Sequence, residues 1–149
     1  LGMKTGAYNI EVILDKNENV YILELGARNG GSLIPQITQY ATGIDMVEYT
    51  IKAALGEDCS DLEMKEALGY WSNYMVHSTK SGKLINVELS DEIKENFVEY
   101  QTDYKKGDDV TAFENSGHAL GTMVFEYKSK EEMFDKISRL PNLVKVEVI

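Results

Sequence analysis

The chain contains few of the residues that build cysteine or histidine sites. Among its 149 residues are one cysteine, Cys59, and two histidines, His77 and His118. A single cysteine excludes an intrachain disulfide and a zinc site made of several cysteines. Two histidines are too few for a typical histidine metal centre. We therefore interpret each histidine as a packing or hydrogen-bonding residue.

Basic residues and long apolar runs are also scarce. The chain has 15 Lys and Arg against 25 Asp and Glu, a net charge of −10, which argues against nucleic acid or an anionic membrane as a partner. No signal peptide and no apolar run of about 18 residues is found, so we expect a cytoplasmic location. The apolar content of 43% is ordinary for a globular protein and allows one substantial core or two small units.

Two segments near the start predict a tight β-hairpin. Residues 7–15 and 20–26 have the composition of strands, and the polar residues 16–19 form a turn between them. This pairing places Lys16 opposite Asn19 and Glu11 opposite Glu24. Opposed like charges destabilise a sheet unless a cation lies between them. Two carboxylates on neighbouring strands form a hard-oxygen site of the kind that Mg²⁺ uses when it also holds nucleotide phosphates.

The two faces of this hairpin differ. We predict that one face is apolar and buried, and it consists of Tyr8, Ile10, Val12, Leu14, Tyr21, Leu23 and Leu25. Glu11 and Glu24 share the other face with Ile13 and Ile22, which is typical of the floor of a cleft. Two exposed glutamates on a half-polar hairpin are the alternative, and the pattern alone favours neither.

A glycine loop follows the second glutamate. Gly30 and Gly31 let backbone N–H groups approach an anion closely, and a helix expected from Leu33 adds a favourable dipole. Arg28 supplies a charged fork for phosphate or carboxylate. The loop is not a Walker A motif, because no Lys-Ser or Lys-Thr follows the glycines. A plain strand-to-helix turn would explain the two glycines equally well.

These motifs resemble the ATP-grasp superfamily of ATP-dependent ligases. The superfamily has a glutamate on one strand and then Glu-x-Asn-x-Arg on the next; here Glu11 precedes Glu24-Leu25-Gly26-Ala27-Arg28. The segment 41–57 is similar to the stretch that follows the metal site in biotin carboxylases. The resemblance covers about residues 3–57.

The resemblance implies a role for each matching residue. Glu11 and Glu24 would hold Mg²⁺, or Mn²⁺ in its place, against the phosphates of ATP. Arg28 would be catalytic and contact phosphate or an acyl phosphate. Asn29, Gly30 and Gly31 would complete the ATP and substrate site.

One position departs from the pattern. Gly26 stands where the superfamily has an asparagine that serves as a further metal ligand. Asn29, or Asn9 opposite Gly26 in the hairpin, could compensate. A second metal position is therefore left open.

Two helices are expected between the loop and the second half of the chain. Residues 33–40 read as a short helix with Pro35 in its first turn. Asp45 begins another, with Glu48 in capping-box position and Gly56 at its end. We expect the apolar stripe of this second helix to pack into the core; it consists of Val47, Ile51, Ala54 and Leu55.

From Ala67 onward strands predominate. Residues 105–108 and 116–121 resemble the C-terminal domain of L-amino acid ligases and related carboxylate–amine ligases. In that architecture His118 could reach a substrate pocket, although a structural role is favoured. We expect the aromatic stripe of Tyr70, Trp71 and Tyr74 to lie in the core, with a substrate pocket as the alternative.

The predicted fold class is α+β. We assign residues 1–57 to the C-terminal part of an ATP-grasp domain with an antiparallel sheet and helices, 58–66 to a linker, and 67–149 to a small mixed α/β C-terminal domain. The resemblance places the lid and the ATP-contacting lysines upstream of such a segment, and neither is recognisable here. The chain is therefore expected to be the C-terminal portion of a larger enzyme and inactive alone.

The expected reaction is ATP-dependent joining of a small carboxylate to an amine or other nucleophile through an acyl phosphate. The resemblance also allows a homo-oligomer. One alternative is a carbamoyl-phosphate-synthase-like or biotin-carboxylase-like enzyme that uses bicarbonate. Another is a non-catalytic metal-binding or assembly domain, which Gly26 favours.

Overall fold

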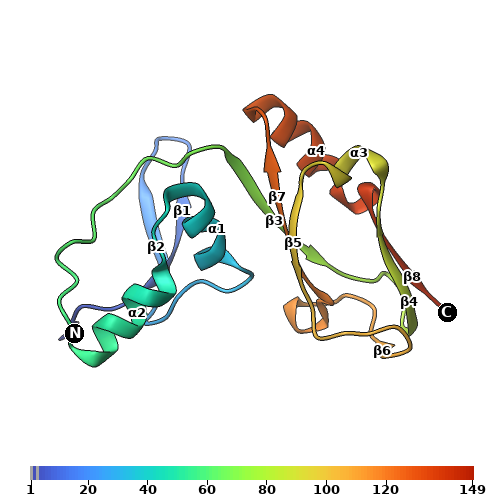
Figure 1. Ribbon diagram of the computed structural model, residues 1–149, viewed down its shortest axis with the longest axis horizontal. Coiled ribbons are helices and arrows are strands. Elements are labelled where there is room, and N and C mark those ends of the chain that lie inside the picture. Colours follow the sequence, from blue (N-terminus) through green and yellow to red (C-terminus); the bar gives the residue numbers. More distant parts are fainter. Residues whose placement is uncertain (1, 3) are drawn as a thin grey trace. The chain divides into compact units, whose positions relative to one another are not determined.

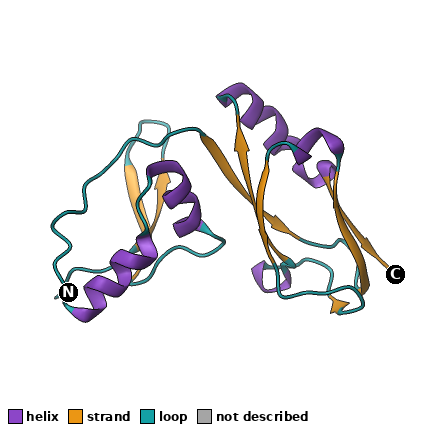
Figure 2. Ribbon diagram, in the orientation of Figure 1, coloured by secondary structure: helices purple, strands orange, loops and turns teal. Residues whose placement is uncertain are grey.

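The computed structural model describes residues 2 and 4–149, which form two compact units, Leu1–Leu68 and Gly69–Ile149. Figures 1 and 2 show helices and strands in both units. Every strand pairing is antiparallel in the described part of the chain. The predicted α+β class is confirmed. The finer division into 1–57, 58–66 and 67–149 stays a prediction.

The first unit contains one hairpin and two helices. Its elements are β1 (Asn9–Leu14), β2 (Val20–Gly26), α1 (Ile34–Thr42) and α2 (Met46–Leu55). The Asp45 carboxylate accepts hydrogen bonds from the N–H groups of Val47 and Glu48, each at 2.9 Å, so the predicted start of α2 is confirmed. Gly56, with φ of 75°, ends α2 in the left-handed conformation.

Asp15 organises the turn of the hairpin. Its carboxylate accepts hydrogen bonds from the N–H of Asn17 at 2.8 Å and of Asn19 at 3.0 Å. The side-chain hydrogen bond from Asn19 is the main cause that lowers the pKa of the Asp15 carboxyl. The Asp15 N–H donates to the Asn19 carbonyl at 3.0 Å. Asp15 therefore faces Asn19, and the predicted pairing of Lys16 with Asn19 is wrong.

The hairpin is more exposed than its pattern predicts. Both faces are open within the described chain: Val12 is 50% exposed and Ile13 is 51% exposed. The predicted burial of the apolar face is therefore wrong for this chain. A two-stranded sheet with two short helices supplies too little apolar surface to cover it.

Helix α2 is also more exposed than its sequence pattern predicts. It buries none of its residues, and the expected core stripe is exposed: Val47 by 44%, Ile51 by 55% and Leu55 by 70%. The buried apolar residues described in this unit are Leu33 and Ala41. The amphipathic pattern of α2 thus marks a face that no other described element covers.

The second unit contains two three-stranded sheets. The first has the order β3 (Tyr70–Val76), β7 (Gly121–Tyr127), β5 (Phe97–Gln101); the second has β6 (Asp109–Val110), β4 (Gly82–Leu89), β8 (Val144–Val148). Two α-helices and a 3₁₀ helix connect them: α3 (Asp91–Lys94), η1 (Ser116–His118) and α4 (Lys130–Leu143). Helix α4 contacts β3 and β7 of one sheet and β8 of the other. Within the described residues, no helix has the length and apolar character to cross a membrane.

The main hydrophobic core lies in this second unit. Val76, Phe125 and Ile93 are fully buried there. The predicted aromatic core stripe is confirmed only for Tyr74, which packs against the core cluster, because Tyr70 is 40% exposed and Trp71 is only half-buried. Alternation along β3 places Trp71 on the opposite face from the two tyrosines.

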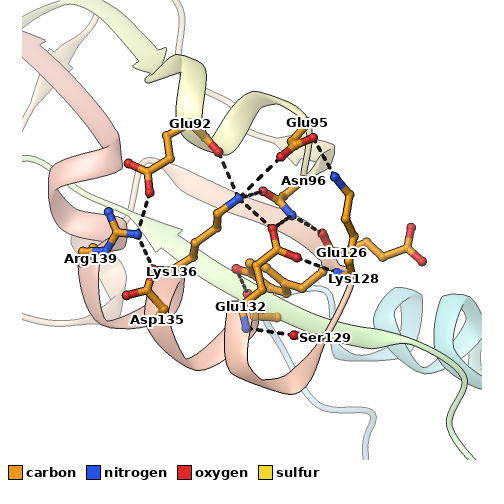
Figure 3. A network of polar contacts seen from close by, with 12 residues as sticks. Glu92, Glu95, Asn96, Glu126, Lys128, Ser129, Glu132, Asp135, Lys136 and Arg139 are labelled. Atoms are coloured by element: carbon orange, nitrogen blue, oxygen red, sulfur yellow. Dashed lines mark hydrogen bonds and ion pairs between the residues drawn. The ribbon is translucent and has the colours of Figure 1, made fainter.

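A buried lysine joins α3, α4 and the segment after α3 in the second unit (Figure 3). Lys136 is 8% exposed, and its ammonium donates to the Asn96 side chain and the Glu132 carboxylate, both at 2.7 Å. It also donates to the Glu92 carbonyl at 3.1 Å. All three donors of the ammonium are therefore used, as a buried charge requires.

Candidate functional site

The hairpin register brings the two predicted metal ligands together. Glu11 and Glu24 are direct partners on β1 and β2, and Asn9 is the partner of Gly26. Both predicted pairings are confirmed. Both glutamates are exposed, and within the described residues neither forms an ion pair. Two carboxylates therefore face one another without a cationic side chain to offset their repulsion.

A β-bulge beside this pair shifts the rest of the hairpin. The register changes between Glu11 and Val12: Glu11 pairs with Glu24, whereas Val12 pairs with Ile22. The extra residue on β2 compensates for the turn that begins one residue earlier than predicted. The glutamates consequently stay opposed although the turn differs.

The bulge also changes which residues share a face with the glutamates. Tyr21 pairs with Ile13, so it lies on the face of Glu11 rather than on the opposite face. The Tyr21 hydroxyl reaches the Asp15 carboxylate at 3.5 Å, in agreement with this placement. The predicted faces of Tyr21 and Ile22 are therefore wrong.

Arg28 lies over the glycine that replaces the expected asparagine. A Cβ atom at Gly26 would meet Arg28 Cγ at 3.6 Å and Arg28 Nε at 3.7 Å. The Arg28 guanidinium donates to the Asn29 carbonyl at 3.0 Å and forms no ion pair among the described residues. The charge of Arg28 thus stays available for an anion, two residues beyond the end of β2.

The loop after Arg28 is held against both helices. The Asn29 amide nitrogen donates to the Thr50 hydroxyl on α2 at 2.8 Å, which commits part of this side chain. A Cβ atom at Gly30 would lie 2.9 Å from Ile34 Cδ1 and 3.2 Å from Ile34 Cβ, so a larger residue there would require the Ile34 side chain to shift. A Cβ atom at Gly31 would meet no heavy atom within 4 Å. Gly31 therefore faces open space beside the start of α1.

The start of α1 offers fewer backbone donors than an ordinary helix, because Pro35 has no N–H and the Ile34 N–H donates to the Gly31 carbonyl at 3.1 Å. Leu33 precedes the helix with φ of 62°, and within the described chain no side chain caps the first turn. Uncapped N–H groups at a helix N-terminus favour an anion. The carboxylates of Glu11 and Glu24, the guanidinium of Arg28 and the N-terminus of α1 thus follow one another along the chain.

The residues present fit one hard cation in part. Carboxylate oxygens suit Mg²⁺, which usually takes only one or two from the protein and completes its shell with water and phosphate. No group of three or more His, Cys, Asp or Glu suited to a metal occurs in the part of the chain that the structure describes. Gly26 adds no ligand, whereas Asn9 lies opposite it. The protein therefore offers an incomplete set that a bound phosphate would complete.

Some contacts were not predictable from the motifs. Thr50 positions Asn29 across 21 positions of sequence, and no local signal marks that contact. His118 lies at the end of η1, where its Nδ1 accepts a hydrogen bond from the Glu114 N–H at 3.3 Å. This contact fits the structural role favoured for His118.

Comparisons with known proteins place these features in context. Residues 2–62 match the family model described as "Carbamoyl-phosphate synthase L chain, ATP binding domain". No match was found among curated protein sequences.

Several solved structures share the fold. L-amino acid ligase from Bacillus licheniformis aligns with a TM-score of 0.80 and 22% identity over 99% of this chain and 37% of its own. Phosphoribosylglycinamide synthetase from Anaerococcus prevotii aligns with a TM-score of 0.73 and 25% identity over 97% of this chain and 37% of its own. Biotin carboxylase from Campylobacter jejuni gives 0.68 and 19%, over 97% of this chain and 32% of its own. The chain thus spans about a third of the length of these structures.

Proposed function

We propose that this chain supplies the metal-binding part of an ATP-dependent carboxylate–amine ligase. The chain has the fold of part of an ATP-grasp domain, and its resemblance to the ATP-grasp superfamily of ligases is confirmed. The observation that carries the proposal is the direct pairing of Glu11 with Glu24, followed by Arg28 over Gly26. Glu11, Glu24 and Arg28 have the residue types that these roles require and follow one another in the order of the superfamily pattern, from which Gly26 departs.

The proposed reaction has two steps. A carboxylate oxygen of the substrate attacks the γ-phosphorus of ATP, ADP leaves, and an acyl phosphate forms. An amine then attacks the carbonyl carbon and loses a proton as inorganic phosphate leaves. Both steps require neutralisation and positioning of phosphate charge more than covalent participation by the protein.

The residues of this chain would divide that task. Glu11 and Glu24 would hold Mg²⁺ or Mn²⁺, which would neutralise phosphate charge when bound. Arg28 would bind the transferring phosphoryl group or the acyl phosphate as a fixed fork. Asn29 would keep the loop against α2, and the backbone at Gly30 and Gly31 would approach the anion.

A metal titration tests the role of the glutamate pair. We expect Mn²⁺, followed by its paramagnetic effect on water relaxation, to bind the Glu24→Gln variant at least about tenfold more weakly than the wild-type chain, because one of two carboxylate ligands is lost. Glu18→Gln is the matched control, since it removes the same charge from the turn of the same hairpin. Equal affinity in Glu24→Gln and wild type would show that Glu24 is not a ligand.

The acceptor distinguishes the proposal from its main rival. One similar structure is a biotin carboxylase domain described as bound to bicarbonate, with 16% identity to this chain. An assay of ADP release with bicarbonate against a panel of amino acids, in a longer chain that includes this segment, separates the two. Stimulation by an amino acid supports the ligase, and stimulation by bicarbonate alone supports the carboxylase-like alternative. The 149-residue chain by itself is expected to turn over no ATP.

A further inference from the structure

A cavity within the second unit has the size and lining of a small-molecule site. Its volume is about 480 Å³, within the range of about 300–1,000 Å³ typical of ligand pockets. Residues of β3, β4 and β8, with the segment after β3, line it. Tyr74 of the predicted aromatic stripe and His77 line this cavity, whereas the glutamate pair and the glycine loop do not.

One wall of the cavity is aromatic and firmly held. The ring of His77 lies 4.6 Å from that of Phe113 and 5.9 Å from that of Tyr74. His77 Nδ1 lies 2.8 Å from the Met75 carbonyl and donates to it, so Nε2 is left to accept a hydrogen bond. The neighbouring Ser78 is buried, and its hydroxyl donates to the Lys80 carbonyl at 2.6 Å. The wall is therefore formed before a ligand arrives.

The open side of the cavity carries exposed charges in alternation. Glu88 on β4 is the direct partner of Lys145 on β8, and Glu147 follows two residues later on the same face of β8. Within the described residues, the Lys145 ammonium forms no ion pair with either carboxylate. Lys94, whose charge acts on Glu88, is itself paired with Asp91 at 2.6 Å. Two carboxylates and one ammonium consequently remain for a ligand.

This arrangement determines which ligand charges are complementary. Two carboxylates favour two cationic groups, and the ammonium between them favours one anionic group. Diagonal neighbours on one face of an antiparallel pair lie about 7–8 Å apart, a separation that an extended basic side chain bridges. The aromatic wall can pack against the methylene groups of such a side chain.

We propose that this cavity binds a dibasic amino acid, with its two cationic groups at Glu88 and Glu147 and its carboxylate at Lys145. The proposal requires neither ATP nor a metal ion and is independent of the function assigned to the glutamate pair. The proposal requires a free amino acid, because the α-nitrogen of a C-terminal residue in a peptide is an uncharged amide.

Binding of a matched ligand series to the 149-residue chain tests the proposal. L-lysine has both amines and the carboxylate, L-norleucine lacks the side-chain amine, and cadaverine lacks the carboxylate. By calorimetry and amide chemical shifts, we expect L-lysine to bind at least about tenfold more tightly than the other two, since each lacks one charged contact. A C-terminally amidated lysine that binds as weakly as cadaverine would support the carboxylate contact.

Variants that each remove one charge show which residue contacts which charged group of the ligand. Glu147→Gln should weaken L-lysine at least about fivefold, and Lys145→Met should weaken L-lysine but not cadaverine. Glu114→Gln and Lys106→Met remove the same charges outside the cavity and should leave binding unchanged. Thermal unfolding followed by circular dichroism checks that each variant folds.

Three results would overturn the proposal. The first is the absence of L-lysine binding at tens of millimolar to a chain that is folded by circular dichroism. The second is equal binding of all three ligands. The third is a set of shifted amides that excludes His77, Glu88 and Lys145.

Discussion

Lys136 shows how a single residue can hold several elements of the second unit together. It lies on a helix whose Phe134 is 60% exposed, so the charged residue is inside and the aromatic one outside. Its ammonium is satisfied by Asn96, Glu132 and the Glu92 carbonyl. Figure 3 shows that these partners come from α4, from α3 and from the segment after α3. A buried lysine with this set of acceptors acts as a structural link between helices.

Removal of this charge is expected to destabilise the chain. Lys136→Met keeps most of the side-chain volume but leaves the Asn96 Oδ1 without a donor and removes the ammonium that faces the Glu132 carboxylate. We expect a loss of about 1–3 kcal/mol in the free energy of unfolding, measured with urea. Lys128→Met, at an exposed ion pair with Glu95, is the control and should cost less than Lys136→Met. Equal losses in the two variants would contradict this role of Lys136.

The Glu132 carboxyl makes the stability contributed by this network depend on pH. Hydrogen bonds from the Lys136 ammonium, the Lys128 N–H and Asn96 lower the pKa of Glu132 from 4.5 to about 2. Because the folded-state pKa is depressed, its stabilisation is fully present above pH 4.5 and is lost as pH falls toward 2. Between pH 6 and pH 3, the urea midpoint of wild type should fall more than that of Glu132→Gln. Parallel midpoints across this range would show that Glu132 is not responsible.

At the scale of elements, close approach of strands decides where glycine is required. Gly121 begins β7 with φ of 147°, and a Cβ atom there would lie 2.3 Å from the Gln101 carbonyl oxygen. Its place between strands is the close approach expected of a strand glycine. The 3₁₀ helix holds Gly117 without positive φ, and its Cβ would meet only the flexible Asn115 side chain at 3.0 Å.

This difference gives a matched pair of variants. Gly121→Ala should lower the free energy of unfolding by about 1–3 kcal/mol, because alanine is strained at that φ and clashes with the neighbouring strand. Gly117→Ala should change it by less than about 1 kcal/mol. Urea unfolding followed by the fluorescence of Trp71, on the neighbouring β3, measures both. A Gly121→Ala chain as stable as wild type would contradict the close approach.

The elements also show how much secondary structure the local sequence pattern predicts. Strand and helix positions, the cap at Asp45 and the end at Gly56 follow from local propensity and were predicted. The two-residue strand β6 and the 3₁₀ helix η1 were not, because neither has enough residues for a periodic pattern. The bulge in β2 was missed as well, since no residue type in that strand demands one.

At the scale of the whole molecule, the two units differ in the amount of apolar surface they bury. The core cluster belongs entirely to residues 69–149, whereas Leu33 and Ala41 are the buried apolar residues described in the first unit. Burial of apolar surface is the dominant favourable term in folding. The second unit should therefore be the more stable of the two.

Hydrogen exchange measures this difference directly. The amides of Val124 and Phe125 on β7 should be protected at least about tenfold more strongly than those of Val12 and Ile13 on β1. The comparison with Val12 and Ile13 is fair because both sets of residues lie in paired strands, whereas only the hairpin sheet is exposed. Equal protection in both units would show that the chain unfolds as one cooperative body.

The hairpin, the caps of α2 and the α+β class follow from local sequence, because these depend on neighbours within a few residues. The opposition of Glu11 and Glu24 also depends on the bulge in β2, which no local pattern indicates. Tertiary structure decided what the patterns could not. The apolar faces of the hairpin and of α2 are exposed. On α4, Lys136 is buried whereas Phe134 is exposed. Tyr74, His77, Glu88 and Lys145 line one cavity. Periodicity states which residues share a face, but only the packing of distant elements determines whether that face is covered.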